Sequence, residues 1–154
     1  MKPLRLLLTA AFLLVTTAIV SARLMGSWSY QQLLDKSDLV VIATPTATSD
    51  TKEQMNLPGY LAMRAIGVET KFRVSTVLKG DKALKDFVLH HYRAPKPDEI
   101  YDNGPHLLSF DPSKKRSFLV FLVRESDGRY APTSGQTDPA YFAVHALEGD
   151  RNLE

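Results

Sequence analysis

The sequence predicts a mainly β fold, a small antiparallel barrel of about five strands with a short N-terminal helix and a possible short C-terminal helix. The longest run of alternating apolar and polar side chains spans residues 66–80. Because successive side chains of a strand point to opposite faces, this run predicts a long strand with one buried face. Two apolar, β-branched segments, 38–44 and 117–123, predict strands that are covered on both faces. Asp127-Gly128 is the strongest short hairpin signal in the chain.

Residues 1–22 have the pattern of a secretory signal peptide. Lys2 and Arg5 give a positive start, residues 6–20 are uncharged and mostly apolar, and residues 20–22 form a cleavage site with small side chains. The alternative is an uncleaved membrane anchor, but the apolar run of about 15 residues is shorter than the ~20 that a spanning helix needs. We therefore expect one barrel domain over 23–148 and a loose tail over 149–154, in the bacterial periplasm or outside the cell.

Charge and cysteine content exclude several classes of function. Removal of Lys2 and Arg5 with the leader reduces the 19 basic residues to 17, which equals the 17 acidic residues. A domain without net charge is not expected to bind nucleic acid or an anionic membrane surface through electrostatic attraction. The chain has no cysteine, which excludes disulfides, cysteine-ligated zinc and thiol catalysis. The apolar core alone must therefore hold the domain together.

The first elements after the leader are a short helix and a strand. Ser27 or Ser29 caps a helix whose apolar face carries Tyr30, Leu33 and Leu34. The apolar strand at 38–44 follows. Residues 50–65, which contain the turn signal Pro58-Gly59, are interpreted as a long loop that joins two antiparallel strands.

The long strand at 66–80 has two distinct faces. Its charged side chains share one face, and the side chains expected to be buried are Ile66, Val68, Thr70, Phe72 and Val74. Two adjacent apolar residues, Val77 and Leu78, interrupt the alternation and predict a bulge or bend before the turn at 79–81.

The second half of the chain alternates strands with turn signals. Residues 87–93 predict a strand, which leads into a surface loop at 94–105 that is rich in Pro, Asp and Gly. After the Asp127-Gly128 turn, residues 129–133 are expected to return antiparallel. Asp138-Pro139 is typical of a helix start with Asp138 as N-cap, so 140–147 forms a helix unless 141–144 forms a strand.

Four segments occur in an order that resembles a known group. They are SDLVVIA, VETKFRVSTVLKG, SFLVFLVRESDGRY and SGQTDP, preceded by the short helix. The order resembles bacterial secreted domains similar to the netrin-like module and the tissue inhibitors of metalloproteinases. The resemblance implies a barrel of the OB type with flanking helices. Inhibitors of that family present an N-terminal cysteine to the protease zinc, and this chain has none, so no functional residue of the family transfers to it.

The histidines are the first candidates for chemistry. His90 and His91 are adjacent on a predicted strand, so they point to opposite faces and cannot both bind one metal ion. His106 lies beside a loop, and no local H-x-H or H-x-x-x-H spacing occurs. We expect one strand histidine to be half-buried and the others to face solvent. No metal site and no cofactor is predicted, and these three histidines are weak metal candidates.

The sequence contains no catalytic motif, and the chain is predicted not to be an enzyme. Ser134 lies in a suggestive loop, but the chain has no G-x-S-x-G elbow, no P-loop and no G-x-G-x-x-G. Acidic residues of the loop at 94–105 are expected to be solvated.

The preferred hypothesis is an exported, non-enzymatic barrel that binds a protein or cell-envelope partner, by analogy with the fold. The expected contact surfaces are the loops at 50–65 and 94–105. The candidate contact residues there are Met55, Tyr60, Met63 and Tyr101. The alternative is a small-ligand or metal-binding domain, or a minor hydrolase, that uses His90 or His91 with Tyr92 and Ser134.

Overall fold

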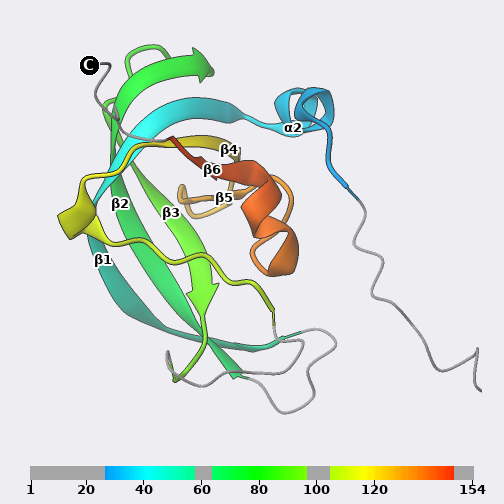
Figure 1. Cartoon of the computed structure of the whole chain (residues 1–154), viewed down its shortest axis with the longest axis vertical. Helices are drawn as coiled ribbons and strands as arrows, with labels where there is room; N and C mark the ends of the chain where they lie inside the picture. Colours follow the sequence, from blue (N-terminus) through cyan, green and yellow to red (C-terminus); the bar gives the residue numbers. More distant parts are fainter. Residues whose placement is uncertain (1–26, 58–63, 97–104, 148–154) are drawn as a thin grey trace, which may run out of the picture.

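The structure is a computed structural model that describes residues 27–57, 64–96 and 105–147 (Figure 1). In chain order its elements are the helix α2 (Tyr30–Lys36), the strands β1 (Leu39–Asn56), β2 (Arg64–Lys79) and β3 (Asp86–Arg93), the 3₁₀ helix η1 (Pro112–Lys114), the strands β4 (Phe118–Arg124) and β5 (Tyr130–Pro132), the 3₁₀ helix η2 (Asp138–Ala143) and the strand β6 (Val144–Ala146).

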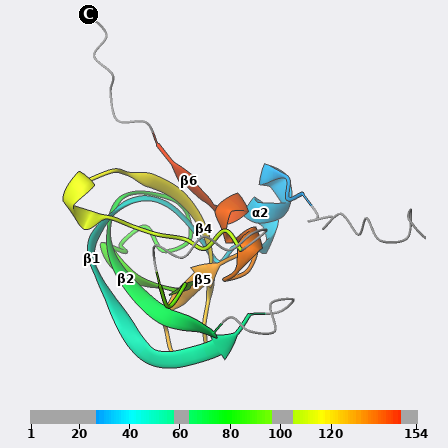
Figure 2. The same ribbon diagram turned by 60° about the horizontal axis from the view of Figure 1, so that its bottom comes forward.

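Five strands close into a barrel. Neighbouring strands follow the order β1-β2-β3-β5-β4, and β4 pairs in turn with β1. The β3–β5 pair is parallel and is bridged at Leu89 and Tyr130, whereas the other pairs are antiparallel. The short strand β6 adds to the edge of β4. β1 and β2 curl together around the barrel (Figure 2). The predicted mainly β barrel is therefore confirmed.

The inner face of β2 lies in the centre of the core, as its alternation predicts. Val68, Thr70 and Phe72 are buried, whereas Lys71 and Arg73 on the other face are exposed. The ring of Phe72 stacks on that of Phe87 with 5.1 Å between centroids. The buried residues of this main core are Leu39, Val41, Ala43, Phe72, Phe87, Leu89, Phe110, Val120 and Leu122.

β2 also bulges where its alternation is interrupted. Val40 pairs with Lys79 and Val41 pairs with Val77, so Leu78 has no partner in the ladder and is exposed. The predicted bulge is confirmed. The predicted hairpin is confirmed as well, because Glu125 N–H donates to the Arg129 carbonyl across a turn in which Gly128 has a φ of 93°.

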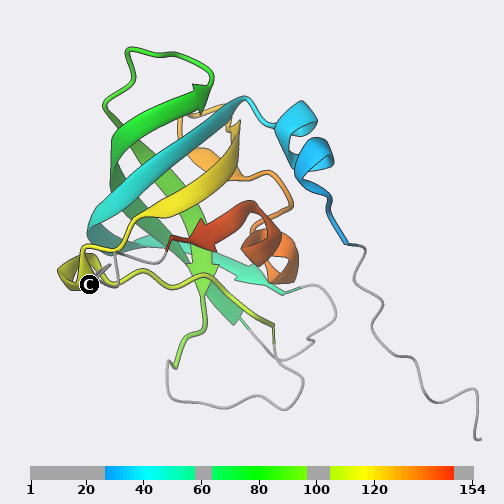
Figure 3. The same cartoon turned by 45° about the horizontal axis from the view of Figure 1, so that its top comes forward.

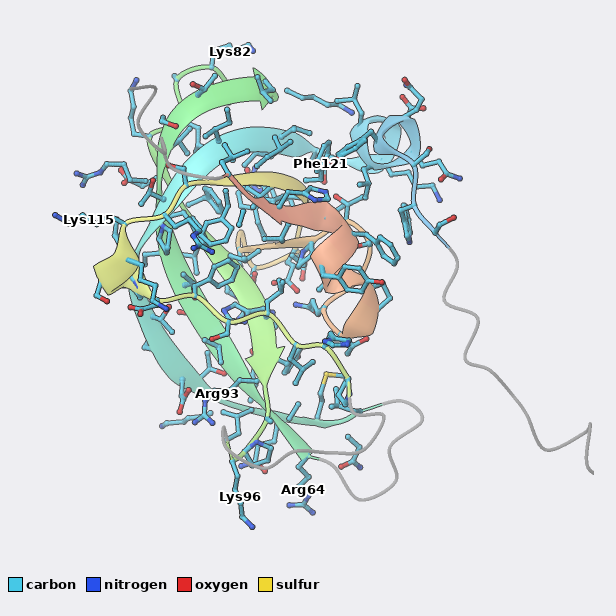
Figure 4. The ribbon with its side chains drawn as sticks, in the orientation of Figure 1. Arg64, Lys82, Arg93, Lys96, Lys115 and Phe121 are labelled. Carbon is cyan, nitrogen blue, oxygen red and sulfur yellow. The ribbon has the colours of Figure 1, made fainter. Side chains whose placement is uncertain are left out.

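A second, smaller core lies outside the barrel and explains why β1 and β4 are apolar on both faces. Leu33 of α2 packs there with Val40, Phe121 and Ala143. Phe121 reaches out of β4 toward α2 (Figure 4), and α2 and η2 lie on the same side of the barrel (Figure 3). The side of β1 and β4 that faces away from the barrel interior is thus covered by both helices.

The expectation for the face of α2 was wrong in part. Ser29, one of the two predicted caps, caps the helix, and it does so through a capping box with Gln32; Leu33 is buried. Tyr30 and Leu34, however, are 62% and 39% exposed. A helix of seven residues that lies on two strands has room to bury only one ridge of side chains, and Leu33 occupies it.

The C-terminal segment is both helical and extended. η2 covers residues 138–143 and β6 covers 144–146, so the predicted helix over 140–147 is present only to residue 143, as a 3₁₀ helix, and the alternative strand at 141–144 coincides with β6 at Val144 alone. The N-cap position is one residue earlier than predicted, at Thr137, and its side chain makes no capping hydrogen bond.

The interpretation of residues 50–65 as a long loop was wrong. β1 continues to Asn56 and β2 begins at Arg64, so both strands extend far into this segment. Asp50 pairs with Val68 and Gln54 pairs with Ile66. Three residues of β1, 51–53, therefore stand opposite a single residue of β2, Gly67, and form a wide bulge.

Candidate functional site

Charged side chains from four parts of the chain gather around His90 on the outer face of β2 and β3. His90 is 3% exposed, and each of its ring nitrogens meets a carboxylate. Nδ1 lies 2.9 Å from Glu125 Oε2, at the start of the β4–β5 hairpin. Nε2 lies 2.8 Å from Glu53 Oε2, in the bulge of β1, at ion-pair distance but without the alignment of a hydrogen bond. His90 is thus held between two carboxylates that come from opposite sides.

Arg129 links the same carboxylates to two more. Its Nη2 lies 3.0 Å from Glu53 Oε1, its Nη1 lies 3.1 Å from Glu69 Oε1, and its Nε lies 2.8 Å from Asp127 Oδ2. Nε is also 3.6 Å from Glu125 Oε2. We call these six residues, Glu53, Glu69, His90, Glu125, Asp127 and Arg129, the His90 cluster.

Gln136 completes the surroundings of His90. Its side-chain amide nitrogen lies 3.2 Å from both the His90 carbonyl and Glu125 Oε1. It also approaches His90 Nδ1 to 2.9 Å. Because an amide nitrogen donates only, Nδ1 donates to Glu125 when it carries a proton and accepts from the Gln136 amide when it does not.

The cluster depends on Gly67. A Cβ atom at this position would lie 2.5 Å from Thr51 Oγ1 and 2.9 Å from Glu53 Cβ, which is too close for any side chain. Thr51 and Glu53 therefore lie directly over the outer face of β2, and this brings the Glu53 carboxylate to His90 and Arg129. Glycine within a strand commonly marks such a close approach.

The local charges shift the titration of several groups. Burial, together with the carboxylates of Glu53 and Glu125, raises the pKa of the Tyr92 hydroxyl, whose ring lies 5.1 Å from that of His90. Although burial lowers the pKa of Arg129, hydrogen bonds to Glu53 and Glu69 raise it above its usual range. The cluster contains four carboxylates against Arg129 and His90, so it carries net negative charge in either protonation state of His90.

His91 points into the barrel, on the face opposite to His90, as predicted. It is 2% exposed and its Nε2 lies 2.9 Å from Thr70 Oγ1, which in turn lies 2.8 Å from Thr48 Oγ1. Burial lowers the pKa of His91 to about 4. The expectation of one half-buried strand histidine was wrong, because both His90 and His91 are fully buried.

The other candidates occupy separate places. His106 is exposed, with its ring 6.4 Å from that of Tyr141. Ser134 donates its hydroxyl hydrogen bond to the Pro139 carbonyl, so it stabilises the loop before η2. Met55 packs against a small satellite core with Leu57 and Ala65. Tyr60, Met63 and Tyr101 lie outside the described residues.

Sequence reasoning did not find Glu53, Glu69, Glu125, Arg129 or Gln136 as site residues. The signal that points to them is Gly67, a glycine on the wet face of an otherwise regular strand. Within 27–57, 64–96 and 105–147, no three histidine or acidic side chains are arranged to hold a metal ion.

Two further surface features are a cleft that shares Asp127 and Arg129 with the cluster and a basic end of the barrel. An open cleft of about 540 Å³ lies between the start of β3 and the β4–β5 hairpin, with walls that include Asp86, Phe87, Arg124, Asp127, Arg129 and Tyr130. Figure 4 shows Arg64 and Lys96 pointing away from the barrel at the end where β3 ends, with Arg93 higher on the strand. Arg93 forms a bidentate ion pair there with Asp50, 2.7 Å and 2.5 Å between the paired atoms.

A scan against protein-family models finds no match for the chain, and a search of curated proteins also finds none. In the described part of the chain, no helix has the length and apolar character needed to cross a membrane.

Proposed function

We propose that the chain is an exported OB-type barrel, similar to the netrin-like group, that binds a protein partner through the outer face of β2 and β3. The OB assignment is supported by the closed order β1-β2-β3-β5-β4, with a parallel β3–β5 pair. OB folds bind their ligands on the face of strands 2 and 3 and on the loops that flank it. The leader at 1–22 supports export to the periplasm or the cell exterior.

The observation that carries this proposal is the position of the His90 cluster. It lies on the face that OB folds use, and it includes residues of the β4–β5 hairpin. Glu53, Glu69 and Asp127 have side chains that are 44%, 37% and 49% exposed, so their outer oxygens are within reach of a second molecule. Excess negative charge favours a partner surface that carries lysine and arginine, and it disfavours nucleic acid.

The test compares two charge reversals of equal size. Glu69→Lys changes the proposed face, and Asp35→Lys changes an exposed position of α2, which lies over β1 and β4. Each tagged protein is used to capture partners from the envelope fraction of its own host. We expect a partner that the wild type and Asp35→Lys retain and that Glu69→Lys loses, with weaker capture at higher salt. Equal capture by both variants would contradict the assignment of the face.

A second candidate function, binding of a small polar ligand, is favoured by the open cleft beside the hairpin. Its volume lies within the range of small-molecule sites, and its walls combine aromatic rings with acidic and basic groups. Elemental analysis and mass spectrometry of the purified protein test it. A stoichiometric bound molecule whose retention depends on Arg124 supports this candidate, and its absence counts against it.

A further inference from the structure

We propose that the bulge of β1 at residues 51–53 is a clasp that is held tightly when His90 carries a proton on both ring nitrogens and loosens when the proton on Nε2 is lost. The proposal concerns the same outer face as the proposed function, but it requires no partner. The two therefore succeed or fail in different experiments.

The first step of the argument is what holds the bulge. Residues 51–53 have no ladder partners on β2, because only Gly67 stands opposite them. The Glu53 N–H is satisfied locally by Thr51 Oγ1 at 3.1 Å. Among the described residues, the ion pairs that join this bulge to distant parts of the chain are those of the Glu53 carboxylate, which meets His90 on β3 and Arg129 after the hairpin.

The second step is the requirement for two protons. A neutral imidazole has one N–H donor and one lone pair, whereas an imidazolium has two donors. Both nitrogens of His90 face carboxylate oxygens at 2.8–2.9 Å. Loss of a proton from Nε2 would place a lone pair against Glu53 Oε2, which turns attraction into repulsion. Loss from Nδ1 would leave a lone pair 2.9 Å from Glu125 Oε2, but the Gln136 amide, also 2.9 Å away, is placed to donate to it, so the proton on Nε2 is the one that holds Glu53.

The third step is the set of charges around the ring. β1 contributes Glu53 and β2 contributes Glu69. β3 contributes Tyr92 on the same face and His91 on the other. The hairpin contributes Glu125, Asp127 and Arg129, and the loop before η2 contributes the neutral Gln136. Arg129 keeps its hold on Glu53 in either state of His90, so the clasp loosens on deprotonation without releasing all of β1.

The fourth step is what opening would expose. Gly67 and His90 are both buried under the bulge, although they lie on the outer face of the barrel. Movement of residues 51–53 away from Gly67 would uncover this part of β2 and β3. The face that is proposed to bind a partner would therefore differ in shape between the two protonation states.

The test combines two measurements on the purified protein over a range of pH values. NMR of the imidazole carbons follows the titration of His90. The signals of His90 are identified because they are absent from the spectrum of His90→Gln. The hydrogen-exchange rates of the amides of 51–56, corrected for the intrinsic effect of pH on exchange, report how tightly the clasp is held. We expect exchange to accelerate about tenfold or more as His90 loses its proton, with the same midpoint. Amides of 40–43 in the core are expected to stay protected.

Two variants on the same segment serve as comparison. Glu53→Gln should exchange rapidly at every pH, because the clasp lacks its anion, whereas Lys52→Gln should behave as the wild type. Corrected exchange that stays constant through the titration of His90 would overturn the proposal. A pH-dependent step that persists in His90→Gln would overturn it as well, because another group would then be responsible.

Discussion

His91 makes the stability of the barrel depend on pH in a way that can be worked out from its surroundings. Its ring is 2% exposed, packs edge-on against Phe110 at 5.2 Å, and is hydrogen-bonded by Thr70. An imidazolium in this place would lose its hydration without gaining an anionic partner. Burial accordingly lowers the pKa of His91 from 6.5 to about 4.

The direction and size of the effect follow from proton linkage. As pH falls below about 6.5, the unfolded chain takes up a proton on His91 and the folded barrel does not, until pH reaches about 4. The unfolded state binds more protons in this window, so the free energy of unfolding decreases as pH decreases. A shift of about 2.5 units at 1.36 kcal/mol each gives a loss of about 3 kcal/mol across the window.

Denaturant titrations at several pH values between these limits measure the loss. Carboxylates also titrate in this range, so the informative quantity is the difference between wild type and His91→Gln. His106→Gln removes an exposed histidine and serves as the matched control. We expect the pH slope to be shallower in His91→Gln by about 3 kcal/mol in total and to be unchanged in His106→Gln. Equal slopes in all three proteins would refute the assignment of His91 to the low-dielectric interior.

Three further predictions concern packing and local structure. Phe72→Ala should lower the free energy of unfolding by about 3–5 kcal/mol, because Phe72 is buried. Arg73→Ala should lower it by less than about 1 kcal/mol, because the Arg73 side chain is 75% exposed. Equal costs in denaturant titrations would contradict this assignment of the faces of β2. Gly67→Ala should lower the free energy of unfolding by about 1–3 kcal/mol. The double variant Gly67→Ala with Thr51→Ala should regain part of this loss, because it lacks Thr51 Oγ1, which lies 2.5 Å from the Cβ position of residue 67. A double variant that is no more stable than Gly67→Ala would show that the strain lies elsewhere. Ser29→Ala should lower the free energy of unfolding by about 1 kcal/mol and Ser27→Ala should leave it unchanged, because Ser29 is the residue in the capping box. A larger loss of stability in Ser27→Ala would contradict this.

The fold could be predicted from the sequence because each short-range pattern of residues arises from a local feature of the structure. The alternation of 66–80 reflects which side chains of β2 face the core, and the interruption at Leu78 reflects the extra residue in the ladder. Asp127-Gly128 permits the positive φ that the hairpin needs. The apolar character of both faces of 38–44 reflects two separate cores, one inside the barrel and one beneath α2.

The His90 cluster could not be predicted in the same way, because its members are brought together by long-range geometry. Glu53 and His90 are distant in sequence and meet only because β1 bulges over Gly67. The residues of 50–56 are mostly polar and exposed, so their pattern resembles a loop although the backbone is a strand. Burial of His90 follows from the same bulge, since the outer face of a strand is otherwise wet.

The face of α2 was mispredicted for a related reason. The spacing of Tyr30, Leu33 and Leu34 indicates one apolar stripe, but the stripe is wider than the surface available on β1 and β4. Leu33 fills that surface, and Tyr30 lies at its edge, with its ring 5.3 Å from His145 and 6.0 Å from Phe121. Amphipathic spacing thus identified the helix and its central contact but not the extent of its burial.

A double-mutant cycle between Glu53 and His90 tests the central claim most directly, namely that the bulge of β1 is held over β2 and β3 by this pair. The free energies of unfolding of the wild type, Glu53→Gln, His90→Gln and the double variant are measured at one pH, below the midpoint of the His90 titration that NMR records. The geometry predicts a coupling free energy of at least about 1 kcal/mol, because His90 is buried and its Nε2 lies 2.8 Å from the Glu53 carboxylate. Additivity of the two single changes to within about 0.3–0.5 kcal/mol would contradict it.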